Sequence, residues 1–593
     1  MSDNPTVRTS THEIRLDGEL GPFTAELSVE PAGEGVEVVT LSLAAPAPAT
    51  PPKVSLVWDH PVVDVQGSWS PFVGRNRGLS PDWGGGSVSR VTSGAPVRCL
   101  YSLGGTSRLT FAASDALNAV NVTAGVREET ANFVCRVAPF AEPGPAIDRY
   151  EIAVRIDTRP VPYWRALADV SDWWAALPGY TPAAVPETAR LPMYSTWYSF
   201  HQDLDVDAVV RQCELSKQLG CEAVIVDDGW QTTDSARGYA YCGDWRPERI
   251  PEMALFVRRV HEAGLKFILW YSVPLVGIRS EAFKRLEGKF LYADPHLSAS
   301  IVDPRFPEVR EYLIGTYERA MREWDLDGFK LDFVDCFRPR AETPQRTAGD
   351  GRDYDSVAAA ADRLMSDVID RLRALRPDVC IEFRQSYVGP LMRKYGNMFR
   401  AGDCPNDAVT NRVATTDIRL VCGTTAAHAD MLLWHADDPV ASAALQLLNI
   451  LFSVPQISVL LDRIPPEHVE MLRFWLGFWR EHRDVLLEAP IEPRGPLALY
   501  PVIVASTASE RVVAVYDNAL ADPGPDVPDE LLVVNATRRG RVVLECGEAL
   551  GSRAVRTFDC RGREVESRTE SFPAGLCAVA IPPAGLAVLT RNR

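Results

Sequence analysis

The hydrophobic positions of the chain follow three patterns in succession. Over residues 1–165, short apolar runs of strand length, such as FTAELSVE (23–30) and KVSLVWDH (53–60), are separated by stretches rich in Gly and Pro, such as PDWGGG (81–86). Several short strands with regular turn signals are typical of a sandwich. The first 165 residues are therefore predicted to form a β-sandwich.

The pattern changes near Leu191, where short apolar runs begin to alternate with longer amphipathic stretches. In DVDAVVRQCELSKQLG (205–220), for example, the apolar side chains recur at helical spacing and share one face. Repeated strand–helix alternation predicts a (β/α)8 TIM barrel over residues 191–485. A doubly wound open sheet is the structural alternative, but no GxGxxG motif follows a predicted strand.

The third pattern returns to short strand-like runs, such as RVVAVYD (511–517) and ELLVVNAT (530–537). These runs predict a smaller antiparallel β domain over residues 486–593. The fold class is thus multidomain, α/β plus all-β, with a central barrel flanked by an N-terminal β-sandwich and a C-terminal β domain. Residues 166–190 are predicted to be the linker before the barrel.

Composition excludes several classes of function. The formal net charge of the 593 residues is −17, and no basic block interrupts it, which argues against nucleic acid and against an anionic membrane surface. No apolar run is long enough to span a membrane. The N-terminal sequence has no apolar segment of the secretory type, and none of the 12 cysteines forms a CxxC pair. We expect a cytoplasmic protein with reduced cysteines.

Charged residues stand at the ends of three predicted barrel strands: Asp227 and Asp228, Lys330 and Asp332, and Arg400 and Asp403. In a TIM barrel the functional residues lie at the carboxyl ends of the strands. One charged strand end is common wherever a strand exits to water, but three in one barrel favour a site. Lys330 and Asp332 are two apart, so their side chains share one face of the strand.

Paired carboxylates are what the cleavage of a glycosidic bond requires, one as nucleophile and one as acid. Asp332 is the nucleophile candidate, because Lys330 would keep it ionised. Asp403 is the acid candidate, provided that desolvation raises its pKa. Three tryptophans at or just beyond strand ends, Trp197, Trp230 and Trp270, either stack on a pyranose ring or pack in the core.

An ordered series of motifs carries a family resemblance. The segments are LGCEAVIVDDGWQ (219–231), GDWRPERIPEMALFVRRVHEAGLKFILWYS (243–272), VDPRFPEVREYL (302–313) and DLDGFKLDF (325–333). From about Leu191 to His468 the chain resembles glycoside hydrolase family 36, the α-galactosidase clan that also contains family 27. The resemblance implies a TIM barrel with flanking β domains and a retaining α-galactosidase that uses neither metal nor cofactor.

The resemblance also implies roles for individual residues. Asp332 is similar to the nucleophile, and Lys330 to the lysine that hydrogen-bonds the sugar. Asp403 looks like the acid/base, with Asp407 as its competitor.

The remaining implied roles concern sugar binding. Asp227 and Asp228 look like the pair that grips the O4 and O6 hydroxyls of galactose. Trp270 resembles an aromatic residue that lines the galactose pocket. Arg400 and Asp430 are similar to an arginine and an aspartate of family 27.

One segment departs from the family pattern. CIEFRQSYVGP (380–390) stands where the family has the Gly-rich CSGGGRFD segment, which meets the 2-position of the sugar. Arg384 therefore either accepts an anionic group of the substrate or pairs with Glu382. Pairing is the expectation here, because buried charges are normally paired.

Four alternatives to hydrolysis of α-galactosides stay open at this point. The first two are galactosyl transfer, as in relatives similar to raffinose synthase, and hydrolysis of a modified sugar such as N-acetylgalactosamine. The third is a metal-dependent barrel hydrolase, and the last is a catalytically silent sugar-binding module. The metal ligands in the third case would be His428, Asp430, His435 and Asp437.

The expected partner is an oligosaccharide or glycoside, and a homo-oligomer is left open. The loop 68–86 is expected either to roof the pocket or, through Trp69 and Trp83, to pack at a domain interface.

Overall fold

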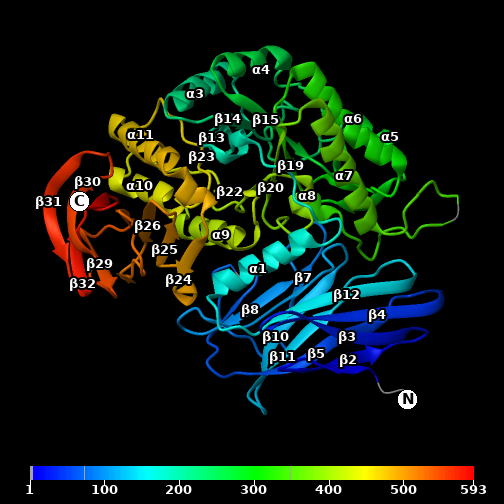
Figure 1. Cartoon of the computed structure of the whole chain (residues 1–593). Coiled ribbons are helices and arrows are strands. Elements are labelled where there is room, and N and C mark those ends of the chain that lie inside the picture. Colours follow the sequence, from blue (N-terminus) through cyan, green and yellow to red (C-terminus); the bar gives the residue numbers. More distant parts are fainter. Residues whose placement is uncertain (1–3, 73, 348, 593) are drawn as a thin grey trace.

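The computed structural model describes residues 4–72, 74–347 and 349–592. Figure 1 shows an N-terminal β domain, a central barrel ringed by helices and a C-terminal β domain, in chain order. This is the predicted fold class.

The N-terminal domain consists of two six-stranded sheets whose strands pair antiparallel. Apolar side chains that alternate along the strands fill the space between the sheets, including Leu41, Leu56, Trp58 and Phe111. The first sheet has the order β1 (Thr6–Arg8), β2 (Glu13–Glu19), β5 (Lys53–Pro61), β11 (Asn132–Ala138), β10 (Val120–Arg127) and β7 (Ser87–Ser89). The second has the order β3 (Thr24–Gly33), β4 (Val36–Ala49), β12 (Ile147–Asp157), β9 (Ser107–Ala113), β8 (Val97–Tyr101) and β6 (Gly67–Trp69).

The segment predicted as a linker is structured. It contains most of α1 (Tyr163–Ala176) and the short 3₁₀ helix η1 (Glu187–Arg190). Trp174 of α1 is buried, and its Nε1 donates to the carbonyl oxygen of Ala113 at 2.9 Å. Helix α1 thus ties the sandwich to the barrel.

The barrel is a sheet of eight parallel strands, with short bridges from His428 to Val454 and from Leu432 to Ile457 that bring its ends together. The strand order is β22 (Ala426–His428), β21 (Met398–Arg400), β20 (Cys380–Arg384), β19 (Gly328–Asp332), β15 (Lys266–Ser272), β14 (Ala223–Val226), β13 (Met193–Ser195) and β23 (Gln456–Ile457).

Helices cover the outside of this sheet (Figure 1). They are α3 (Val206–Gln218), α4 (Met253–Glu262), α5 (Glu281–Arg285), α6 (Pro307–Trp324), α7 (Val357–Leu375), α8 (Met392–Tyr395), α9 (Ala408–Val421), α10 (Val440–Asn449) and α11 (Pro466–Glu481). The short α2 (Trp197–Phe200) directly follows β13 at its carboxyl end. Excursions between them form β16 (Leu275–Gly277), β17 (Phe290–Asp294), β18 (Ala299–Val302) and the 3₁₀ helix η2 (Val334–Cys336).

The backbone conformation of one residue shows where the chain turns at the carboxyl end of β19. Phe333, directly after Asp332, adopts a left-handed backbone conformation with φ 62°. The chain therefore leaves the strand sharply, which ends β19 at Asp332. The same edge of the sheet receives the ends of β14, β20 and β21, as expected for parallel strands.

The C-terminal domain has a seven-stranded sheet and a three-stranded sheet, and its pairs are antiparallel except for β26–β28 and β27–β29. The larger sheet has the order β24 (Ile491–Arg494), β25 (Val502–Ser506), β26 (Glu510–Val515), β28 (Glu530–Asn535), β33 (Leu586–Arg591), β30 (Gly551–Phe558) and β31 (Glu564–Phe572). The smaller has β27 (Leu520–Ala521), β29 (Arg541–Cys546) and β32 (Gly575–Ala580). A π-helix, η3 (Asp484–Glu488), and a 3₁₀ helix, η4 (Pro496–Ala498), lie near its start.

All three domains meet at Asp417 of α9. Its carboxylate accepts hydrogen bonds from Trp69 Nε1 at 2.9 Å and from the hydroxyl of Tyr500 at 2.6 Å, and it pairs with Arg77 at 2.7 Å. Trp69 therefore packs at a domain interface, whereas Trp83 of the same loop is 79% exposed.

The N-terminal domain also touches the carboxyl edge of the barrel. Gly94 N donates to Ser386 O at 2.7 Å, just after β20, and Arg75 pairs with Asp407 at 2.6 Å, just after β21. Within the described residues, no helix has both the length and the apolar character needed to cross a membrane.

Candidate active site

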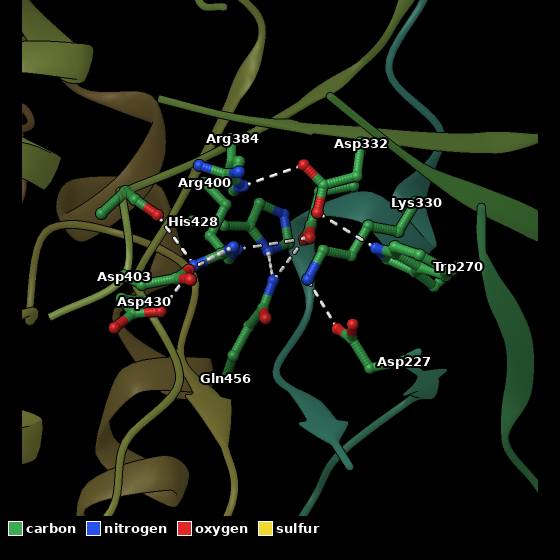
Figure 2. Close-up of polar contacts among 12 residues, drawn as sticks. Asp227, Trp270, Lys330, Asp332, Arg384, Arg400, Asp403, His428, Asp430 and Gln456 are labelled. Carbon is green, nitrogen blue, oxygen red and sulfur yellow. Dashed lines mark hydrogen bonds and ion pairs between the residues drawn. The ribbon is translucent and has the colours of Figure 1, made fainter. Parts of the chain in front are cut away.

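Asp332 lies at the centre of a cluster of polar side chains at the carboxyl edge of the barrel (Figure 2). Its Oδ2 accepts from Trp270 Nε1 at 3.0 Å. Its Oδ1 accepts from Arg384 Nε at 2.9 Å, from Phe333 N at 2.8 Å and from the hydroxyl of Tyr387. Both oxygens of this buried carboxylate thus have donors.

These neighbours set the ionisation of Asp332. Burial raises the pKa of the carboxyl, but the charges of Arg384 and Lys330 and the hydrogen bonds from Tyr387 and Trp270 lower it by more. The pKa of Asp332 is therefore held well below its ordinary value. An ionised carboxylate in a shielded position is what a nucleophile requires.

Asp403 stands on the segment after β21, and its side chain is 46% exposed. Arg400 Nη2 donates to its Oδ1 at 2.9 Å. Burial raises the pKa of Asp403, but Arg400, Lys330 and Arg384 together lower it by more. The expected upward shift for an acid is therefore wrong for this structure, because the charges of three cations, on β19, β20 and β21, together outweigh the effect of burial.

Arg400 is the buried hub of the carboxylate set around β21. Besides Asp403, it pairs with Asp430 at 2.5 Å through Nη1, and its Nε lies 3.5 Å from Glu382 Oε1. Asp430 in turn accepts from the hydroxyl of Tyr198 at 2.8 Å. The structure thus brings Asp430, which only the family resemblance had indicated, together with Arg400 and Asp403.

A second charged group occupies the other side of Asp332. Lys330 Nζ lies 2.5 Å from Asp227 Oδ2, and Asp228 N donates to Asp227 Oδ1 at 2.9 Å. The Asp228 carboxylate accepts from Gln202 and Gln231, each at 2.6 Å. Burial, opposed by these hydrogen bonds, raises the pKa of Asp228 to about 6.

Arg384 and Glu382 do not pair with each other, so that expectation is wrong. Arg384 pairs with Asp332 (Figure 2). Glu382 instead lies 3.5 Å from Arg400 and accepts from Gln456 Nε2. Glu382 and Arg384 are two apart and share one face of β20. Arg384 is the last residue of that strand, and its long side chain reaches across to Asp332 on β19 instead.

The tryptophans divide into three cases. Trp230 is fully buried, and its Nε1 donates to the carbonyl oxygen of Trp270, so it belongs to the core and offers no surface to a sugar. Trp270 is buried as well and acts on the site through its hydrogen bond to Asp332. Trp197 is half-buried and stacks on His201, with 3.9 Å between ring centroids.

Two alternatives from the sequence do not fit the geometry: Asp407 as the acid/base, and a metal site. Asp407 accepts from Thr410 N at 3.0 Å as the N-cap of α9 and pairs with Arg75, which engages it away from Asp332. His428 is buried against the carbonyl oxygen of Ala189, while the side chains of His435 and Asp437 are 76% and 91% exposed. Among the described residues these groups do not converge on one point.

Several residues of the site escaped sequence analysis. They are Tyr198, Gln202, Gln231, Tyr239, Tyr387 and Gln456, of which Tyr239 stacks at 6.3 Å on Trp270. Most lie in loops after strands, where no periodicity marks them. Only Tyr387 could have been found from the sequence, because it lies in the segment CIEFRQSYVGP, which differs from the family pattern.

The fold and the site define a (β/α)8-barrel protein with a shielded, ionised carboxylate on β19 and a second, more exposed one after β21, both at the carboxyl edge of the barrel. Residues 184–393 match the family model described as Melibiase. Together with the relatives below, this match confirms the resemblance to glycoside hydrolase family 36 seen in the motifs.

Curated relatives share limited identity with the chain. Alpha-galactosidase Mel36A of Lactobacillus acidophilus is 24% identical over 156 residues, which are 24% of this chain and 20% of that protein. The A type blood alpha-D-galactosamine galactosaminidase of Flavonifractor plautii is 23% identical over 212 residues, which are 29% of this chain and 19% of that protein. The chain thus matches about a fifth of the length of each of these relatives.

Solved structures extend the likeness to the whole fold. A variant of the GH36 alpha-galactosidase AgaA of Geobacillus stearothermophilus, in complex with 1-deoxygalactonojirimycin, has a TM-score of 0.65 and 15% identity, covering 98% of this chain and 83% of that one. TtGalA of Thermus thermophilus has a TM-score of 0.51 and 16% identity, covering 85% and 98%. At this identity the likeness establishes the fold, with its barrel and flanking β domains.

Proposed function

We propose that this protein is a retaining α-galactosidase that hydrolyses terminal α-galactosides through a covalent glycosyl-aspartate on Asp332. The observation that carries the proposal is the Asp332 carboxylate, which is buried, ionised and held by Trp270, Tyr387 and Arg384 at the carboxyl edge of the barrel. Asp403, on the segment after β21, is the acid/base.

The chemistry follows from these two carboxylates. A carboxylate oxygen of Asp332 attacks the anomeric carbon, the glycosidic C1–O bond breaks, and the proton of Asp403 passes to the leaving oxygen. Water then attacks the same carbon while Asp403 takes its proton, and the ester bond to Asp332 breaks. Two inversions at one carbon leave the configuration retained.

The sugar is bound by the charged group on the other side of Asp332. Asp227 and Asp228 accept hydrogen bonds from the O4 and O6 hydroxyls, and Lys330, fixed on Asp227, donates to the ring substituents. Since the hydrogen-bonding partners of these residues are already in place, the site is preorganised for a polar ligand. The galactose preference is supported by the family assignment and by the alpha-galactosidases among the relatives.

The geometry also explains how Asp403 obtains its proton. In the free protein Arg400 keeps its pKa low, and the side chain is 46% exposed. A bound substrate excludes water from this carboxyl, and burial raises a carboxyl pKa. The acid is therefore completed when the sugar enters, and activity is expected to favour acidic pH.

The test is hydrolysis of aryl α-glycosides of galactose, glucose, N-acetylgalactosamine and the corresponding β-L-arabinopyranoside. Wild type should prefer galactose, Asp332→Asn should lose at least about 10³-fold in kcat, and Asp407→Asn, the matched control, should stay active. Nuclear magnetic resonance of the first sugar product should show the α anomer. Hydrolysis of none of the panel, or full activity of Asp332→Asn, would contradict the proposal.

Galactosyl transfer would use the same nucleophile, and the reaction products distinguish it from hydrolysis. Incubation with galactoside and an excess of a sugar acceptor should yield mainly free galactose. A predominant oligosaccharide product would reassign the protein as a transferase while leaving the role of Asp332 intact.

A further inference from the structure

Arg384 holds the nucleophile but retains unused hydrogen-bonding capacity. Its Nε donates to Asp332 Oδ1 at 2.9 Å and its Nη1 to the carbonyl oxygen of Gln385 at 3.2 Å. Within the described part of the chain, Nη2 donates to no acceptor, and the side chain is 24% exposed. A guanidinium has five N–H donors, so some of them remain for a ligand.

The position of this guanidinium is fixed by its surroundings. Its central carbon lies 5.7 Å from the centroid of the Phe333 ring and 5.4 Å from that of Tyr387. Cations are attracted to aromatic ring faces at such distances. Arg384 is thus a cation built into the site beside the reacting carboxylate, at the place where the family has glycine.

The strand order indicates which part of the sugar Arg384 meets. The order β14, β15, β19, β20 puts Asp227 and Asp228 on one side of Asp332 and Arg384 on the other. In a galactose ring whose O4 and O6 lie at Asp227 and Asp228 and whose C1 lies at Asp332, C2 is the neighbour of C1 on the side away from C6. The substituent on C2 therefore faces Arg384.

The reaction removes the one ion-pair partner that Arg384 has among the described residues. When Asp332 forms an ester with the sugar, its negative charge disappears, and a shielded cation without a partner is unfavourable. Of the other carboxylates nearby, Asp403 is engaged with Arg400, and Glu382 with Arg400 and Gln456. Asp335 is near enough to interact with the charge of Arg384 but forms no ion pair with it among the described residues. An oxyanion on C2 would replace Asp332 as the partner.

We propose that Arg384 is a specificity-determining residue that binds an anionic substituent on C2 of the glycone, so that the preferred substrates are α-galactosides carrying a sulfate- or carboxylate-type oxyanion at that carbon. This inference rests on the proposed function. The same charge on C6 would face Asp227 and Asp228 and be repelled. A protonated amine on C2 would be repelled by Arg384 itself.

The experiment compares four aryl α-galactosides: the unmodified sugar, its 2-O-sulfate, its 6-O-sulfate and its 2-amino-2-deoxy analogue. The two sulfates have equal mass and charge, so they differ only in which side of Asp332 the charge meets. For wild type, kcat/KM for the 2-O-sulfate should exceed that for the unmodified sugar by about tenfold or more, as one added charge-assisted hydrogen bond provides. The 6-O-sulfate and the amine should fall below the unmodified sugar.

Arg384→Met tests the residue. The ratio of kcat/KM between the 2-O-sulfate and the unmodified sugar should fall to about one or below in this variant, and a general loss of rate cancels in that ratio. The control is Arg279→Met, because Arg279 is a surface arginine whose guanidinium likewise lies over a ring, that of Tyr241 at 5.5 Å. The ratio should not change in the control.

Two results would overturn the inference: a wild-type ratio of one or below, or an unchanged ratio in Arg384→Met. The wild-type ratio decides by itself if Arg384→Met does not fold. If the unmodified galactoside is hydrolysed in a manner that depends on Asp332, but the 2-O-sulfate is not preferred, this inference is wrong and the proposed function still stands. Failure to hydrolyse any of the galactosides defeats the proposed function.

Discussion

Arg400 Nη2 lies 2.9 Å from Asp403 Oδ1, so the acid/base candidate is an ion-pair partner in the free protein. The same arginine also contacts Asp430 and Glu382. Its charge is therefore shared among three carboxylates, and of these Asp403 is the one exposed enough to meet a substrate. The pH dependence of the reaction should therefore change when the charge of Arg400 is removed.

The pH profile of kcat/KM should be displaced toward acid. The free enzyme needs Asp403 protonated, and its pKa is lowered, so kcat/KM falls as pH rises through that lowered value. Asp332 stays ionised to still lower pH, because its pKa is held well below the ordinary range. Arg400→Gln removes the cation and should move the basic limb upward by about one to three pH units.

The control for this shift is Arg393→Gln. Arg393 is buried like Arg400, but it contacts Ser171 on α1 rather than the carboxylate set. Loss of a buried arginine alone should leave the basic limb where it is. A basic limb that does not move in Arg400→Gln would show that another group supplies the proton.

Tyr387→Phe should weaken the nucleophile without changing the fold. The hydroxyl of Tyr387 donates to Asp332 and helps to keep its pKa low. Its loss should lower kcat by about 10- to 100-fold, the value of one hydrogen bond to a charged group, and should shift the acidic limb of kcat/KM upward. Tyr395→Phe is the matched control, since Tyr395 is a buried tyrosine bonded to Asp362 away from the site. Equal effects of the two substitutions would argue against a role for Tyr387.

The Lys330–Asp227 pair should show coupling in stability as well as in activity. Both side chains are buried, so Lys330→Met leaves a shielded carboxylate unpaired at a cost of about 3–5 kcal/mol. The double variant Asp227→Asn/Lys330→Met should recover part of that loss, although kcat/KM stays low. Denaturant unfolding measures the free energy of unfolding.

Lys284→Met provides the exposed comparison, because Lys284 pairs with Glu281 on the surface and should cost less than about 1 kcal/mol. Additive losses in the double variant would mean that Lys330 and Asp227 act independently.

Asp417→Asn should lower the stability of the protein without changing catalysis. It removes the charge that pairs with the buried Arg77 and receives Trp69 and Tyr500 from the two flanking domains. We expect a loss of about 3–5 kcal/mol in unfolding free energy with kcat/KM of the folded protein unchanged. Glu13→Gln, in the exposed Arg8–Glu13 pair, is the control and should change neither quantity. A drop in kcat/KM would place Asp417 in the active-site machinery.

The barrel and its strand ends could be predicted because strand and helix periods alternate clearly and carboxyl ends of parallel strands share one edge. The positions of Asp332, Arg400 and Asp403 followed from this reasoning, whereas Asp430 came only from the family resemblance. Contacts between neighbouring strands could not be predicted in the same way. Which residue Arg384 reaches depends on the stagger of β20 against β19 and on the length of its side chain.

Two further differences have the same origin. Trp230 follows a strand end as Trp197 does, but the chain turns it into the core, where its Nε1 finds the carbonyl oxygen of Trp270. The pKa of Asp403 was expected to rise on burial, and burial does raise it, but three cations from three strands outweigh that effect. The spacing of residues along the sequence predicts neither where a loop side chain points nor which charges from other strands surround a carboxyl group.

The measurement that most directly tests the account is identification of the residue that becomes glycosylated. A 2-deoxy-2-fluoro-α-galactosyl fluoride should inactivate the protein with time, and mass spectrometry of the digested protein should find one fluorogalactosyl group, on Asp332. A label on another carboxylate would contradict the assignment of the nucleophile. Turnover of galactosides with the inverted anomer as first product, and no label, would contradict the covalent mechanism.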